Sequence, residues 1–166
     1  MRCSQDVSLL QAVARPLVVL GFDYGERLIG VAVGQMITGT ATPLATLEQH
    51  AGRIDWDGIE VLVDAWNPDA FVVGLPGGPP DAARELKTAI GGFRRTLEAR
   101  FEKPTHTVDE AYTSVEAHHH IKTNRQNARA HGRVNPRRVN KGAIDKVAAA
   151  ILLEAWMADP RSHQLP

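Results

Sequence analysis

Apolar residues along the chain fall into short continuous runs and into helically spaced groups. Short apolar runs bounded by turn residues predict buried strands, whereas apolar positions repeating every three to four residues predict helices. The predicted strands are 17–23, 28–34, 40–47, 70–74 and 104–108. The predicted helices are 54–66, 81–101, 113–121 and 142–158.

This order of elements predicts an α/β fold. We expect a mixed sheet, in which a three-strand antiparallel meander is followed by parallel strands, with helices on both faces. In such a sheet the first strand is central, so strands 17–23 and 104–108 end at the same edge. A chain of 166 residues can form one domain with a substantial core. We interpret 1–15 as an N-terminal extension and 16–160 as that domain.

Acidic residues occur where this sheet would bring them together. Asp23 ends the first strand, and Asp109 and Glu110 end the last one. Asp145 lies in the first turn of the closing helix, on the same apolar face as Ala149, so it should point at the sheet. Converging carboxylates repel one another unless a cation lies between them. Hard divalent cations such as Mg²⁺ prefer such oxygen ligands.

The four acids are therefore candidate metal ligands for phosphodiester cleavage, because divalent ions can stabilise both the attacking and the leaving oxygens. Each acid also has a structural explanation. Asp23 could form the turn before Gly25. Asp109 or Glu110 could cap the helix that follows. Asp145 could simply favour the positive end of its helix dipole.

The net charge of zero conceals a basic segment. Seven of the 19 Lys and Arg residues, and no Asp or Glu, lie between His118 and Lys141. Such a segment on an otherwise acidic chain favours contact with a polyanion, although a solvated loop would have the same composition. Because 122–139 has few apolar residues and no period, we predict a mobile loop there. The candidate substrate-binding residues are Lys141, Arg125, Arg129, Arg133, Arg137 and Arg138.

Several classes of protein are disfavoured by composition. The single cysteine, Cys3, excludes a disulfide or a cysteine metal site within one chain and fits a reducing, cytoplasmic setting. No apolar run reaches the roughly 18 residues that a membrane span needs, so we expect no membrane contact. The pattern D-x-G-x-x-x-x-G from Asp23 to Gly30 resembles the phosphate loop of actin-like and sugar-kinase ATPases. Those proteins use two such domains, and this chain is long enough for one.

Four ordered motifs, spread over about residues 17–158, resemble a known family. They are FDYGERLIGVAVGQ…TGTATPL, VVGLP, VDEAYTSVEA and NKGAIDKVAAAILLE. This set is similar to the YqgF-type, RuvX-like proteins, a Holliday-junction-resolvase-like family assigned as pre-16S rRNA nucleases. The resemblance implies a ribonuclease H-like fold. It also implies a cytoplasmic endonuclease, dependent on Mg²⁺ or Mn²⁺, that processes the 5′ end of pre-16S rRNA.

Position by position, Asp23, Glu110 and Asp145 match the three acidic residues of that family, which are its expected catalytic residues. Ala111 replaces an arginine of the family pattern, and this removes a possible bidentate phosphate contact. Three functions therefore stay open. They are an endonuclease acting on structured RNA, a nuclease acting on branched DNA such as a Holliday junction, and a non-catalytic rRNA-binding or ribosome-associated factor. Any of these could act as a monomer or a homodimer.

Overall fold

The computed structural model describes residues 18–50, 52–76, 81, 83–109 and 141–158. Its elements are β1 (Val18–Tyr24), β2 (Leu28–Gln35), β3 (Thr40–His50), β4 (Arg53–Ile54), α1 (Trp56–Trp66), β5 (Ala70–Leu75), α2 (Arg84–Phe101), β6 (Thr105–Asp109) and α4 (Lys141–Ala158). The predicted extension 1–15, helix 113–121 and basic loop 122–139 lie outside the described residues.

The strands form one six-stranded sheet in the order β4-β3-β2-β1-β5-β6. Strands β1, β2 and β3 pair antiparallel, as the predicted meander requires. Strand β5 lies parallel to both β1 and β6. The predicted mixed sheet with a central first strand is therefore confirmed. Because β1, β5 and β6 run in the same direction, their carboxyl ends meet at one edge of the sheet.

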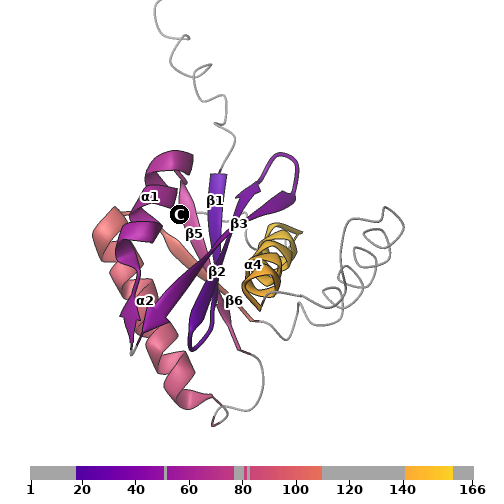
Figure 1. Ribbon diagram of the computed structural model, residues 1–166. Coiled ribbons are helices and arrows are strands. Elements are labelled where there is room, and N and C mark those ends of the chain that lie inside the picture. Colours follow the sequence, from indigo (N-terminus) through magenta and orange to yellow (C-terminus); the bar gives the residue numbers. More distant parts are fainter. Residues whose placement is uncertain (1–17, 51, 77–80, 82, 110–140, 159–166) are drawn as a thin grey trace, which may run out of the picture.

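Helices cover both faces of this sheet, as predicted. Figure 1 shows α1 and α2 on one side of the strands and α4 on the other. The core beneath α1 and α2 is partly aromatic: the Phe22 ring packs edge-on against Phe71 and Phe93, with centroids 5.9 and 5.5 Å apart. These contacts fix the end of β1 that carries Asp23.

The α4 face has a smaller core, built from the apolar stripe that predicted the helix. Ala149, Leu152 and Trp156 are all buried, which confirms the predicted orientation of this helix. Where α4 packs against β3, the Glu154 carboxylate accepts a hydrogen bond from the backbone N–H of Ala41, at 3.1 Å. None of the helices in the described parts of the chain has the length and apolar composition of a membrane span.

The largest departure from the predicted elements occurs where β3 meets α1. Strand β3 extends to His50, and a short β4 pairs with its last two residues. Consequently α1 begins at Trp56 rather than at Ile54. The Asp55 side chain caps the helix by accepting a hydrogen bond from the N–H of Gly58, at 2.9 Å.

Candidate active site

Asp23 is the penultimate residue of β1, and its side chain lies on the α4 face of the sheet. Alternate residues of a strand point to opposite faces. Val19, four positions earlier, packs in the α4 core, and a Cβ on Gly21 would collide with Leu153 of α4. Asp23 therefore faces the same side. Its partner across the antiparallel pair is Gly30 on β2.

Gly30 brings α4 down onto this point of the sheet. A Cβ on Gly30 would overlap the backbone carbonyl of Asp145 and would lie 2.8 Å from the backbone nitrogen of Lys146. Only glycine lets the helix backbone approach so closely. Since Gly30 is the register partner of Asp23, the first turns of α4 lie one strand away from Asp23 and on its face. The structure thus brings two of the predicted acids, Asp23 and Asp145, to one place.

The carboxylate of Asp145 has an unusual environment. Its Oδ2 atom is buried and has no hydrogen-bond partner among the described residues. A buried polar oxygen without a partner is unfavourable unless a cation or a hydrogen-bond donor compensates it. A divalent cation between Asp145 and Asp23 would supply that compensation, and carboxylate oxygens are the ligands that Mg²⁺ and Mn²⁺ prefer. The two residues therefore fit the cation that the family implies.

The other predicted ligands are placed differently. Asp109 is the last residue of β6 and pairs with Leu75, whose side chain packs against the core beneath α1 and α2. Paired residues share a face, so Asp109 lies on the opposite side of the sheet from Asp23. Glu110 falls outside the described residues. Among those that are described, no group of three metal-ligating side chains forms.

The predicted substrate-binding residues receive little structural description. Lys141 is the first residue of α4, but its side chain is outside the described part. The five arginines of the predicted basic loop also lie outside the described residues.

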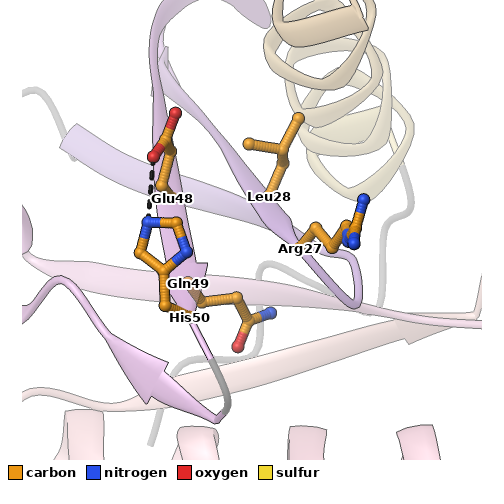
Figure 2. A pocket seen from close by; sticks show the side chains of 5 residues that line it. All are labelled: Arg27, Leu28, Glu48, Gln49 and His50. Carbon is orange, nitrogen blue, oxygen red and sulfur yellow. Dashed lines mark hydrogen bonds and ion pairs between the residues drawn. The ribbon is translucent and has the colours of Figure 1, made fainter.

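A cavity of about 450 Å³, which the sequence analysis did not predict, opens beside the turn that follows Asp23. Its lining consists of Arg27, Leu28, Glu48, Gln49 and His50. Figure 2 shows Arg27 across the opening from Glu48 and His50. The Nε2 atom of His50 lies 3.1 Å from the Oε2 atom of Glu48. The sequence feature that could have indicated this cavity is Arg27, a basic residue four positions after Asp23. The lining residues on β3 lie about 20 positions further along the chain than Arg27, and only the pairing of β2 with β3 brings them beside it.

His106 is a half-buried neighbour of α4 rather than part of the acidic cluster. It lies on β6, and its ring packs against Trp156 with centroids 5.3 Å apart. Burial lowers the pKa of His106 from its usual 6.5, and the Arg94 guanidinium lowers this pKa further, while Glu98 opposes the shift. The neutral imidazole is therefore the form that the folded protein favours.

Comparisons with known proteins agree with this architecture. The family model described as "RuvX: Holliday junction resolvase" matches residues 17–159. A relative from Azotobacter vinelandii, named "Putative pre-16S rRNA nuclease", is 44% identical over 144 residues, which are 87% of this chain and 95% of the relative. A relative of the same name from Legionella pneumophila (strain Paris) is 39% identical over 140 residues, or 84% and 94% of the two chains.

A solved structure extends the comparison to the fold. T. thermophilus RuvC in complex with a Holliday junction substrate superimposes with a TM-score of 0.52 at 11% identity, covering 84% of this chain and 91% of that one. This likeness confirms the predicted ribonuclease H-like fold. Together with the family match over most of the chain, it shows that the protein belongs to the RuvX family of Holliday junction resolvases.

Proposed function

We propose that this protein is a divalent-metal-dependent endonuclease that processes the 5′ end of pre-16S rRNA. The substrate is the one that the names of its relatives carry. A metal-dependent reaction is supported by the position of Gly30, which pairs with Asp23 on one side and lies against the backbone of Asp145 on the other. It is supported further by the Oδ2 atom of Asp145, which is buried and has no hydrogen-bond partner among the described residues. The substrate implies a cytoplasmic location and contact with assembling ribosomal particles.

In this proposal, Asp23, Glu110 and Asp145 hold Mg²⁺ or Mn²⁺ at the edge where the parallel strands end. Asp109 is the weaker candidate for the second ligand, because it lies on the opposite face of the sheet. When bound, the ion would supply charge stabilisation at the phosphate and a more acidic water molecule. The protein's own carboxylates fix the position of that ion, and rigid strands hold them in place.

Phosphate groups of the substrate need cationic partners around this acidic site. Lys141, at the start of α4, and the arginines of segment 122–139 are the proposed contacts. Binding through such contacts weakens steeply with salt, because each neutralised phosphate releases counterions. Arg27 stands on the turn directly after Asp23 and is exposed, so it is available for the same purpose.

Branched DNA is the second candidate substrate. The description of the matching family as Holliday junction resolvases favours it. The same carboxylates could serve either substrate, since both reactions displace an oxygen at a phosphodiester. A comparison of purified protein on a pre-16S rRNA 5′ leader and on a four-way DNA junction separates the two.

The test of the proposal is replacement of the two acids that the structure brings together. Asp23→Asn and Asp145→Asn should each lower Mg²⁺-dependent cleavage of the rRNA leader at least about a hundredfold, because a catalytic ion contributes several kcal/mol. Asp57→Asn is the matched control, since Asp57 is exposed in the first turn of α1 on the other face. Cleavage that persists in pure Asp23→Asn protein would refute the assignment.

A further inference from the structure

The Gln49 side chain is a buried amide on the α1–α2 face of the sheet, behind the turn that follows Asp23. It lies near the end of β3, and only 5% of the residue is exposed. In the part of the chain that the structure describes, the buried polar residues are Gln49 and Thr105. A buried amide is costly unless its donors and acceptor are satisfied, so the partners of Gln49 show what it is retained for.

Among the described residues, both side-chain partners of Gln49 belong to the turn that follows Asp23. Its Nε2 donates to the carbonyl oxygen of Gly25, and its Oε1 accepts from the hydroxyl of Tyr24 at 3.2 Å. Its backbone N–H donates to the carbonyl oxygen of Arg27 at 2.9 Å. Gln49 thus bonds to three of the four residues between Asp23 and the start of β2. Figure 2 shows its amide pointing away from the Glu48 carboxylate.

The turn is closed by a bond of its own, from the N–H of Gly25 to the carbonyl of Leu28, at 3.0 Å. Tyr24 extends the support into the core, because its ring packs on Phe93 of α2 with centroids 5.1 Å apart. Gln49 therefore links the turn after Asp23 to β3, while Tyr24 links it to α2.

We propose that Gln49 is a positioning residue for Asp23. By fixing both sides of the turn, it sets the direction in which Asp23 leaves β1 and so the distance between the Asp23 and Asp145 carboxylates. Metal ligands must be held within roughly 0.5 Å of their productive geometry, and residues behind them supply that precision. This inference rests on the proposed function, in which Asp23 is a metal ligand.

The test compares two Gln49 variants with a matched control in the full chain. Gln49→Leu removes both side-chain bonds, whereas Gln49→Glu keeps an acceptor for Tyr24 but loses the donor to Gly25. Thr105→Val removes a buried polar group of similar exposure that is far from the turn along the sheet. The readouts are the Mn²⁺ dissociation constant from calorimetry, the hydrogen-exchange rate of the Gly25 amide from NMR, and the thermal midpoint.

Both Gln49 variants should bind Mn²⁺ about tenfold more weakly, because a loosened turn no longer holds Asp23 in its productive position. This is the lower end of the loss seen when a direct hydrogen-bond partner of a metal ligand is removed. They should also exchange the Gly25 amide faster at temperatures where the protein is folded. Thr105→Val should leave both readouts unchanged, even if its thermal midpoint falls. A Gln49 variant that folds and binds Mn²⁺ within twofold of the native protein would overturn the inference.

Two further outcomes remain decisive. If Gln49→Leu does not fold, Gln49→Glu carries the test, because its size and its bond to Tyr24 are retained. If the native protein does not bind Mn²⁺, the proposed function fails. The hydrogen-exchange rate of the Gly25 amide then still tests whether Gln49 holds the turn. Unchanged exchange at Gly25 in Gln49→Glu would show that Gln49 does not hold the turn.

Discussion

The Oδ2 atom of Asp145 is buried where α4 approaches the sheet closely, and this approach is possible because Gly30, beneath the helix backbone, has no side chain. Helical spacing predicts that Asp145 faces the sheet with Ala149, and the structure confirms that face. The spacing could not reveal that Gly30 would lie beneath it, since that contact depends on how β2 pairs and where α4 docks. Residue spacing did not separate Asp109 from Glu110 either, and only the family resemblance favoured Glu110. Strand register places Asp109 on the opposite face, and Glu110 as a ligand stays a prediction.

His106 gives a pH dependence that belongs to a single residue. Its pKa in the folded protein is lowered, chiefly by burial and then by Arg94, from the usual 6.5. As the pH falls through 6.5, the unfolded chain binds a proton that the folded protein resists, so stability is lost. We expect the thermal midpoint to fall more steeply between pH 7.5 and pH 5.5 in the native protein than in His106→Phe.

Phenylalanine is the informative replacement because it keeps a ring against Trp156 and removes the titrating group. The measurement is the thermal midpoint across that pH range in buffers of constant ionic strength. Parallel curves for the two proteins would mean that His106 does not titrate differently in the folded and unfolded states.

Among the elements, α4 owes its position to glycines on two neighbouring strands. A Cβ at Gly21 or Gly34 would meet Leu153, and one at Gly30 would meet the helix backbone. Apolar runs and helical spacing were enough to predict every described strand and helix except β4. The two-residue β4 has no pattern of its own, because it forms only by pairing with the end of β3.

Of the glycine-to-alanine substitutions on the α4 face, Gly30→Ala should lower the stability of the protein most. Its Cβ would collide with helix backbone, which cannot rotate away as a side chain can. Overpacking typically costs about 1–3 kcal/mol, and we expect a loss at or above the upper end of this range. Cleavage and Mn²⁺ binding should fall as well, since α4 must shift and carry Asp145 with it. Chemical denaturation and calorimetry measure the two effects.

Gly91→Ala is the matched control on α2. A Cβ there would have no described atom within 4 Å, and alanine favours a helix over glycine by up to about 1 kcal/mol. This variant should therefore be slightly more stable and fully active. If Gly30→Ala were as stable as Gly91→Ala, the close approach of α4 to β2 would be wrong.

At the level of the whole molecule, topology concentrates the proposed chemistry at one edge. The predicted order of elements was sufficient to predict that β1 is central and that β5 and β6 are parallel to it. The family motifs were sufficient to predict the ribonuclease H-like fold. The buried Gln49 and the cavity beside Arg27 could not be predicted. Both depend on β3 residues that are distant in sequence from Asp23 and reach it only through the sheet.

In the proposed function, Asp23 and Asp145 hold one divalent cation. The decisive measurement is a crystal structure of the protein with Mn²⁺, with the ion located by its anomalous scattering. We predict an anomalous peak between these two carboxylates, within about 2.0–2.3 Å of an oxygen of each, with Glu110 as the third protein ligand. If no peak appears at this position at a saturating Mn²⁺ concentration, or if the ion is bound by neither carboxylate, Asp23 and Asp145 are not the metal ligands.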